Sequence, residues 1–520
     1  MGTNCCKSSK ENPDEICEPD SANPQHSGES AALVERLVRE FLSVIRTLVD
    51  HDPPIFFMEL IHIADKNYVL VVQSLCRAIP LEELVGPLVI SQILYECPSP
   101  SKEDLIGFIN LLETPSFKDD AYERNLCVAL ACVADRMAGP YAVSLLTETT
   151  LNFLVERLDH RKKHDTQVVL FALIALEKFA QTSENRVTIE KFLNAEYDSN
   201  NHPLRALETW ADEEDPIRRQ VGFCAQWVLD NIFLLPDRDY SYTRVTLKGI
   251  NAILNGQDMT ECMKVSPNGL EARADACSFE SVRSTFEVSE GCWYYEVELV
   301  TDGIMQIGWA TRNSKYSNHD GYGIGDDQYS IAYDGCRQLI WYCGHSIPIN
   351  HKPWKPNDIL GCLLDIDNKE CLFSLNGVPQ PSLVGSVFFD STKNAGFFAA
   401  ASFMTYQQCR FNFGSREFVY RPTDRKFKCF NECGSLNEES ARIIPNHMKL
   451  RRGSLGVTNA CSICVDSEAS TRLEPCGHSG FCDKCANVLE NCPLCRAEIS
   501  QRKTTKEVQT REAETSDETA

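Results

Sequence analysis

The C-terminal part of the chain contains four short pairs of metal-binding residue types, and this stretch decides how the rest is interpreted. It runs from Cys461-Ser-Ile-Cys464 through Cys476-Gly-His478 and Cys482-Asp-Lys-Cys485 to Cys492-Pro-Leu-Cys495. Zinc prefers four thiolate or imidazole ligands at tetrahedral corners, and two cysteines separated by two residues fit one edge of that tetrahedron. Four pairs supply the ligands of two complete sites. We therefore predict two structural Zn²⁺ ions, because a closed four-ligand site leaves no position for a reactive water.

The order of these ligands, three cysteines, one histidine and four cysteines, resembles the C3HC4 type of RING finger. The resemblance implies a cross-braced fold, in which the first and third pairs hold one zinc ion and the second and fourth pairs hold the other. The first ion would be held by Cys461, Cys464, Cys482 and Cys485. The second would be held by Cys476, His478, Cys492 and Cys495. A reduced segment that is merely rich in cysteine is the alternative, and the ordered set of pairs argues against it.

The resemblance also implies E3 ubiquitin ligase activity. A RING finger does no covalent chemistry; it holds a ubiquitin-charged E2 enzyme so that the thioester is oriented for attack by a substrate lysine. Ile463, Pro493 and Leu494 match the positions at which the family contacts E2. Arg496 matches the family's linchpin, a cation that bridges E2 and ubiquitin, and its planar guanidinium can donate to two carbonyls at once. The alternative is an adaptor whose zinc ions only stabilise a fold.

Composition limits the class of protein. The chain has 520 residues, enough for about three domains. It carries 74 acidic and 51 basic residues, a net charge of −23, so we expect no nucleic-acid partner. Cysteines outside the four pairs show no regular spacing and no apolar leader follows Met1, which favours a reducing, cytoplasmic location. The apolar runs in the first half are too short to span a bilayer.

Residues 1–29 contain no aromatic residue and many polar ones, which predicts a disordered N-terminal tail. Gly2, Cys5 and Cys6 suggest myristoylation together with palmitoylation, and two lipid anchors would attach the protein to a membrane. The usual motif has Ser or Thr at the sixth position, where this chain has Cys6. A tail without lipid is therefore the alternative.

Apolar residues recur at helical spacing over residues 30–235, and breakers such as Pro53 and Pro54 separate the segments. Three segments are apolar on nearly all sides, as in helices buried between neighbours: Leu126–Ala134, Val168–Ala175 and Val221–Val228. Their intervals lie near those of armadillo and HEAT repeats but are not constant. We predict an α-helical, armadillo-like domain, with a plain helical bundle as the alternative.

Residues 265–416 contain many short segments of alternating or β-branched residues, such as Trp293–Val300 and Phe397–Phe403. Asn376-Gly377 is a typical hairpin turn. This pattern predicts an antiparallel β-sandwich. Sequences such as Gly291-Cys-Trp-Tyr-Tyr-Glu-Val-Glu and Gly321-Tyr-Gly-Ile-Gly-Asp-Asp resemble the SPRY (B30.2-like) domain.

The SPRY resemblance implies a bent sandwich whose loops recognise a protein partner. Exposed aromatic residues make good anchors in such loops. The candidate substrate-binding residues are Tyr316, His319, Tyr322, Asp326 and Tyr342, and each has the alternative role of an ordinary turn or core residue.

The expected chain is thus a multidomain α + β protein with linkers at 236–264 and 417–458, a RING finger at 459–500 and a disordered acidic tail at 501–520. This order of domains resembles RING finger and SPRY domain-containing proteins. We expect an E3 ligase whose SPRY domain recruits a protein substrate and whose partners include an E2 enzyme and ubiquitin.

The RING finger could also form a dimer. The compact segment with Pro475 before Cys476 resembles RING fingers that dimerise, but apolar residues after the fourth pair are sparse, so dimerisation stays open.

Overall fold

The computed structural model describes residues 24–47, 53–113, 119–137, 140–198, 201–316, 321–380, 386–393, 395–437, 442–446, 448, 461, 469–476, 478–493 and 499–504. The chain divides into two compact units. One comprises Met1–Trp227 with Leu247–Leu436, and the other comprises Val228–Thr246 with Asn437–Ala520. No helix in the described ranges has both the length and the apolar character needed to cross a membrane.

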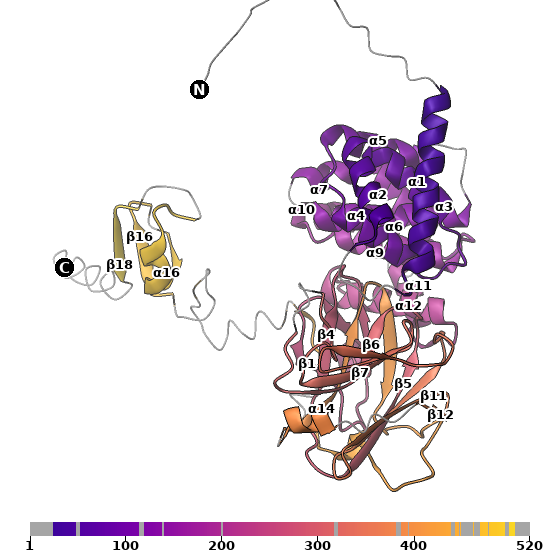
Figure 1. Cartoon of the computed structure of the whole chain (residues 1–520). Coiled ribbons are helices and arrows are strands. Elements are labelled where there is room, and N and C mark those ends of the chain that lie inside the picture. The colour runs from indigo at the N-terminus through magenta and orange to yellow at the C-terminus, as the bar shows by residue number, and fades with distance from the viewer. Residues whose placement is uncertain are drawn as a thin grey trace, which may run out of the picture. The chain divides into compact units, whose positions relative to one another are not determined.

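The first half of the chain is helical, as predicted (indigo to magenta in Figure 1). Its helices are α1 (Pro24–Val44), α2 (Ile55–Lys66), α3 (Tyr68–Ala78), α4 (Gly86–Glu96), α5 (Lys102–Glu113), α6 (Asp120–Arg136), α7 (Pro140–Leu145), α8 (Glu148–Leu158), α9 (Thr166–Phe179), α10 (Ser183–Glu196), α11 (Pro203–Glu208), η2 (Thr209–Asp212), α12 (Pro216–Asn231) and α13 (Ser241–Arg244). Polar side chains cap several of them: Asn67 accepts the N–H of Leu70, and Asp119 accepts that of Tyr122.

The central helices pack in sequence, α3 on α6 and α6 on α9, as stacked helical repeats do. The prediction that Val168–Ala175 is buried on all sides is confirmed, because every residue from Val168 to Phe179 in α9 is buried. Helix α1 begins at Pro24, inside the stretch predicted to be a disordered tail. Composition gave the wrong boundary because proline is tolerated in the first turn of a helix. The backbone N–H groups of that turn have no acceptor within the helix, so the N–H that proline lacks is not needed.

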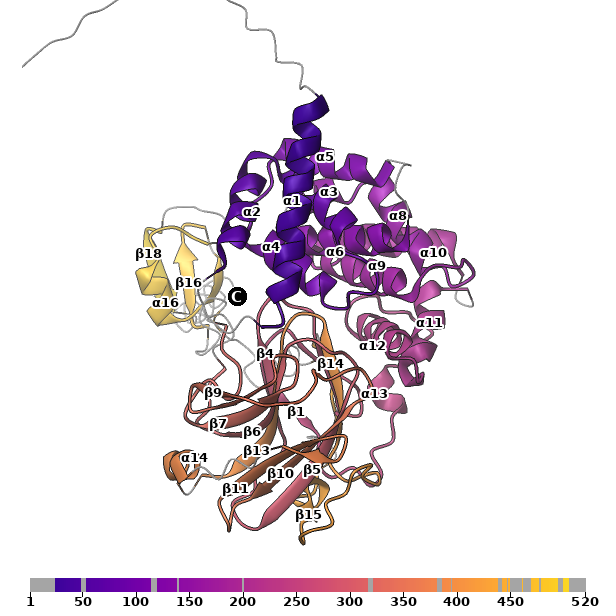
Figure 2. The same cartoon turned by 45° about the vertical axis from the view of Figure 1, so that its right-hand side comes forward.

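Strands between residues 254 and 429 form the two sheets of a sandwich in which every pair is antiparallel except β15 with β5 (Figure 2). The seven-stranded sheet has the order β1-β4-β13-β6-β7-β8-β9, and the eight-stranded sheet has the order β12-β11-β10-β5-β14-β3-β2, with β15 beside β5. The strands are β1 (Leu254–Met259), β2 (Met263–Val265), β3 (Glu271–Ala274), β4 (Glu280–Ser284), β5 (Cys292–Leu299), β6 (Met305–Thr311), β7 (Ser330–Asp334), β8 (Leu339–Tyr342), β9 (His345–Pro348), β10 (Ile359–Asp365), β11 (Glu370–Leu375), β12 (Val378–Pro379), β13 (Phe397–Phe403), β14 (Gln407–Asn412) and β15 (Lys428–Cys429). A short helix, α14 (Ser386–Ser391), precedes β13.

The hairpin predicted at Asn376-Gly377 is confirmed. Both residues have positive φ, 51° and 76°, and they join β11 to β12, as a type I′ turn requires. Between the sheets, Tyr295 and Trp309 meet edge to face with ring centroids 5.0 Å apart. Phe430 closes this aromatic core, 5.7 Å from Trp309.

The sandwich extends beyond the predicted limits of 265–416. Strand β1 and the first two residues of β2 lie in the expected linker 236–264, and β15 with the 3₁₀ helix η4 (Phe430–Glu432) lies in the expected linker 417–458. Sequence reasoning missed β1 because Leu254–Met259 is mostly polar and lies at a sheet edge, where alternation is weak. The amide of Asn431 joins these outer segments, since its Oδ1 accepts the N–H of Asn251 and its Nδ2 donates to the carbonyl of Gly249.

A buried ionic network joins the helices to the sandwich within the first unit. Lys264 Nζ of β2 donates to Glu177 Oε2 of α9 at 2.6 Å and to Asp275 Oδ2 at 2.7 Å, and all three side chains are at most 5% exposed. Arg273 donates to Asp275 at 2.8 Å and to Gln220 Oε1 of α12 at 2.9 Å. The ions are paired and hydrogen-bonded, as buried charges must be.

An aromatic contact supports the same junction. Ser91 of α4 donates to the hydroxyl of Tyr406 at 3.0 Å, and the ring of Phe171 in α9 meets that of Tyr406 edge to face at 5.0 Å. Burial raises the pKa of the Tyr406 hydroxyl well above its usual range. Since polar and apolar contacts cross the junction together, helices and sandwich form one body.

The C-terminal part of the second unit is a small sheet with one helix. Strand β16 (Thr471–Glu474) pairs antiparallel with β17 (Ser479–Phe481) and with β18 (Gln501–Thr504), and α16 (Asp483–Val488) packs on it. Strand β18 lies in the predicted disordered tail 501–520. Its sequence is polar and charged, but Arg502 Nε donates to the carbonyl of Ala486 at 2.7 Å, a long-range contact that composition does not reveal.

Candidate metal centres and recognition surface

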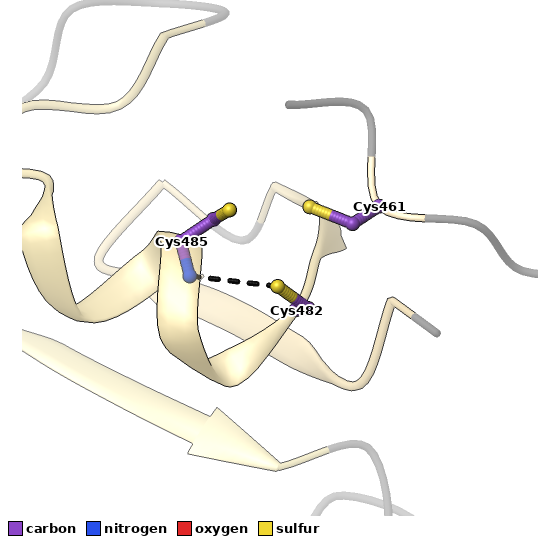
Figure 3. Close-up of side chains that lie close together, drawn as sticks. All are labelled: Cys461, Cys482 and Cys485. Atoms are coloured by element: carbon purple, nitrogen blue, oxygen red, sulfur yellow. Dashed lines mark hydrogen bonds between the residues drawn. The ribbon is translucent and has the colours of Figure 1, made fainter. Parts of the chain in front are cut away.

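The first group of metal-ligand atoms comes from Cys461, Cys482 and Cys485. Their sulfur atoms lie within 4.8 Å of one another, and Figure 3 shows them directed toward a common space. Cys482 caps the start of α16, where its sulfur accepts the N–H of Cys485 at 3.5 Å (dashed in Figure 3). The first turn of this helix therefore brings two cysteines to one side, and Cys461 reaches them from 21 residues upstream.

The second group comes from Cys476, His478 and Cys492, whose ligand atoms also lie within 4.8 Å of one another. Cys476 and His478 belong to the turn between β16 and β17, and Cys492 follows α16. Cys492 Sγ lies 3.6 Å from His478 Nδ1. Each group therefore combines pairs that are not neighbours in sequence, the first with the third and the second with the fourth.

The donor sets fit zinc. Three thiolates in one group, and two thiolates with an imidazole in the other, are soft to borderline ligands at the separations of a tetrahedral site. Cys464 and Cys495, the predicted fourth ligands, lie outside the described residues. A bound ion would add to the small core that the described residues form, in which Leu473, Phe481, Ala486 and Cys492 are buried and Cys476, Leu489 and Ile499 pack against them.

Among the predicted E2-contacting residues, Pro493 is described and exposed, whereas Ile463, Leu494 and Arg496 lie outside the described residues. Sequence reasoning missed Val488, which ends α16 and is 81% exposed. The spacing of Val488 from Ala486 could have indicated this exposure. Residues two positions apart lie on different sides of a helix, so when Ala486 faces the core Val488 faces away from it. Val488 and Pro493 are thus two exposed apolar residues of this small sheet-and-helix segment.

The structure groups two of the five predicted recognition residues. Tyr322, 42% exposed, and Asp326 line a cavity of 410 Å³ on the sandwich. Asp326 Oδ2 accepts the N–H of Gly323 at 2.7 Å, which fixes the loop between them. The strand residues Gln306 and Trp341 also line this cavity and were missed, although a polar glutamine inside the apolar strand Met305–Thr311 was an available signal.

The other three predicted residues are not part of this cavity. The ring of Tyr316 stacks on the guanidinium of Arg283 at 4.6 Å, and its hydroxyl donates to the carbonyl of Asp258 at 3.4 Å. Tyr316 is thus a packing residue and not an exposed anchor, because it covers a buried cation. Tyr342 of β8 is half-buried and does not line the cavity, and His319 lies outside the described residues. The predicted lipidation residues Gly2, Cys5 and Cys6 also lie outside them.

Comparison with protein families now defines both regions. A model of the SPRY domain matches residues 292–416. A model described as a zinc finger, C3HC4 type (RING finger), matches residues 457–502. The chain carries a SPRY domain and a RING finger. The sandwich described above contains the SPRY domain, and the small sheet with α16 and both cysteine groups is the RING finger.

Curated relatives match parts of the chain. The E3 ubiquitin-protein ligase RKP of Arabidopsis thaliana is 34% identical over 149 residues, which cover 28% of this chain and 11% of RKP. The ATP-dependent RNA helicase DDX1 of Xenopus laevis is 26% identical over 176 residues, 33% of this chain and 22% of the helicase. The matched region therefore spans less than a quarter of either relative.

Solved SPRY domains are also similar to part of the chain. The SPRY domain of human HERC1 is 13% identical, covers 30% of this chain and 96% of that domain, and has a TM-score of 0.26. The PSpry domain of TRIM65 is 13% identical, covers 34% of this chain and 99% of that domain, and has a TM-score of 0.25.

Proposed function

We propose that this protein is a RING-type E3 ubiquitin ligase. The observation that carries the proposal is the pair of interleaved cysteine and histidine groups inside the matched C3HC4 segment. The name of the relative RKP as an E3 ubiquitin-protein ligase supports it. The RING finger would hold a ubiquitin-charged E2 enzyme, and ubiquitin would pass to a substrate lysine without a covalent intermediate on this chain.

Two zinc ions give the RING finger its fixed shape in this proposal. Cys461, Cys464, Cys482 and Cys485 hold one ion, and Cys476, His478, Cys492 and Cys495 hold the other. Four protein ligands close each site, so the metal contributes folding free energy and no reactive water.

The E2-binding surface consists of Ile463, Pro493 and Leu494, with Arg496 as the linchpin toward ubiquitin. Val488 at the end of α16 is a further exposed apolar residue of the RING finger, 81% exposed.

The SPRY domain recruits the protein substrate. Its cavity, lined by Tyr322, Asp326 and Trp341, is the recognition site in this proposal. An exposed aromatic ring beside polar groups is the usual composition of a protein-binding hot spot.

The ligase would act in the cytoplasm, and membrane attachment through acylated Gly2 would be tested by fractionating a Gly2→Ala variant.

Autoubiquitination of the full chain with a panel of E2 enzymes tests the ligase proposal. We expect wild type to form ubiquitin chains with at least one E2. Ile463→Ala and Arg496→Ala should each lower the rate at least about tenfold, because binding energy and orientation of the thioester are lost. The matched controls are Val419→Ala and Arg312→Ala, exposed residues of the SPRY domain that should leave the rate unchanged. Absence of activity with every E2 would favour the alternative, a non-catalytic adaptor.

A further inference from the structure

A second pocket of the sandwich, of 250 Å³, lies where the start of β3 meets the end of β14. Neither Tyr322 nor Asp326 lines it, so it is separate from the proposed recognition cavity. Although the whole chain has a net charge of −23, three of the side chains that line this pocket are basic: Lys248, Arg410 and Arg416. We call it the basic pocket.

Arg410 is held at the wall of the basic pocket by the strands on both sides of β14. It stands directly opposite Glu271 of β3 and Glu298 of β5. Its Nε lies 3.7 Å from Glu271 Oε2, and its Nη1 lies 3.5 Å from Glu298 Oε2. The guanidinium of Arg410 is therefore in position before a ligand binds, and such preorganisation lowers the entropic cost of binding.

The other two cations of the basic pocket are exposed and have no acidic partner. Among the residues that the structure describes, no carboxylate forms an ion pair with Lys248 or with Arg416. Partial burial and the like charge of Arg410 lower the pKa of Arg416, although Glu298 opposes this shift. An anion bound between Arg410 and Arg416 would relieve their repulsion.

The carboxylates beside the basic pocket compensate only part of its positive charge. Glu298 is shared by Arg410 and by Arg219 of α12, whose Nη1 lies 3.0 Å from Glu298 Oε1. Burial raises the pKa of Glu271 to about 7, although Arg410 opposes this shift, so near neutral pH this group carries only part of a charge. Even when both are fully ionised, Glu271 and Glu298 balance only Arg219 and Arg410. The charges of the two exposed cations remain.

This excess of positive charge fits a phosphate group better than a carboxylate. A phosphate monoester carries about −1.5 to −2 near neutral pH and has three acceptor oxygens, whereas a carboxylate has one charge and two oxygens. Guanidinium groups donate to such oxygens through a planar fork, and the hydroxyl of Ser415, which also lines the basic pocket, is a further donor. A volume of 250 Å³ has room for the group, since one water occupies about 30 Å³ of the liquid.

We propose that the basic pocket binds a phosphate monoester, with Lys248, Arg410 and Arg416 as its cations and the hydroxyl of Ser415 as a neutral donor. The ester belongs either to a phosphorylated side chain of a protein or to a small phosphate metabolite, and both present the same group to the pocket. This site goes beyond the proposed function, because neither ubiquitin transfer nor recognition at the cavity of Tyr322 requires it.

A titration of O-phosphoserine with the full chain, followed by phosphorus-31 NMR, tests the proposal. We expect a Kd of about 1 mM or lower. Succinate, a dicarboxylate of similar charge, should displace the phosphate at least about tenfold more weakly, because its oxygens are divided between two separate groups.

The double variant Lys248→Gln with Arg416→Gln removes the two exposed cations and should raise the Kd for O-phosphoserine at least about tenfold. Its matched control is Arg312→Gln with Lys393→Gln, which removes the same charge from exposed positions that do not line the basic pocket. The control should bind as wild type does. Both double variants must keep the thermal midpoint of wild type, which separates lost binding from lost folding.

A peptide library with phosphoserine at a fixed central position and random flanking residues distinguishes the two sources of the ester. Selected peptides that bind at least about tenfold more tightly than O-phosphoserine would assign the basic pocket to a phosphorylated protein. Peptides that gain nothing from their flanking residues would assign it to a small phosphate ester.

Three results would overturn the proposal. They are no binding of O-phosphoserine up to about 10 mM, equal displacement by succinate, and an unchanged Kd in the variant of Lys248 and Arg416. Equal displacement would mean a general attraction of anions. These titrations contain no E2 enzyme or ubiquitin, so their outcome is independent of the ligase proposal.

Discussion

At the scale of single residues, Lys264 shows how much of this molecule depends on one buried cation. Its ammonium lies between Glu177 of the helical domain and Asp275 of the SPRY domain, at 2.6 and 2.7 Å. Burial by itself lowers the pKa of Lys264, but Asp275 and Glu177 outweigh it and raise the pKa above its ordinary value. Removing the cation would leave two carboxylates in the protein interior.

We predict that Lys264→Met destabilises the protein by about 3–5 kcal/mol, because breaking a buried pair leaves uncompensated charge. The measurement is urea unfolding of the full chain at pH 7, followed by tryptophan fluorescence.

The same network predicts how stability depends on pH. Burial raises the pKa of Asp275, but Arg273 and Lys264 lower it to about 2. Its contribution to stability is therefore present above about pH 4, the unfolded value, and is lost as pH falls toward 2.

The control for this prediction is Lys393→Met, which removes an exposed lysine of the same domain. It should change the free energy of unfolding by less than about 0.5 kcal/mol. Equal effects of the two substitutions would mean that the buried network contributes no more than a surface charge.

At the scale of elements, the described part of the RING finger has a hairpin, a third strand and one short helix around a small group of apolar side chains. The cluster of Leu473, Phe481 and Ala486 with Cys492 is small, and units below about 40 residues usually need a metal or disulfides to fold. The interleaved ligand groups join β16–β17 to α16 from both sides. Metal binding and folding of this element should therefore be one event.

We predict about two zinc ions per chain in the purified protein, and about one or fewer in Cys461→Ser or Cys476→Ser. Elemental analysis measures the stoichiometry, and limited proteolysis shows whether the RING finger becomes sensitive while residues 24–436 stay resistant. Cys262→Ser, an exposed cysteine of the SPRY domain, is the control and should retain all the zinc. Full zinc content in the two ligand variants would contradict the ligand assignment.

At the scale of the whole molecule, the boundary between domains is not where the sequence pattern places it. The SPRY domain includes β1, the first two residues of β2 and the core residue Phe430, all outside 265–416. Its face around Lys264, Arg273 and Asp275 is covered by α9 and α12. The helical domain and the SPRY domain are thus one structural unit that depends on both parts.

We predict that a fragment of residues 265–416 is insoluble or unfolded, whereas residues 24–436 fold with a single cooperative transition. The shorter fragment loses two strands and exposes charges that need Glu177 and Gln220 as partners. Size-exclusion chromatography and thermal denaturation of both fragments measure this. Two separate transitions in the longer fragment would show that the junction is weaker than its contacts indicate.

Local sequence determined the elements whose signal is short-range. The spacing of the cysteine pairs, the Asn376-Gly377 turn and the apolar helix at Val168–Ala175 were all readable, because each depends on residues within a few positions of one another. Tertiary structure alone decided that Lys264 meets Glu177, that Phe430 meets Trp309, and that Phe57 and Phe279 line the same cavity. Edge strands and buried ion pairs leave no local periodicity, since they are stabilised by groups far away in the chain.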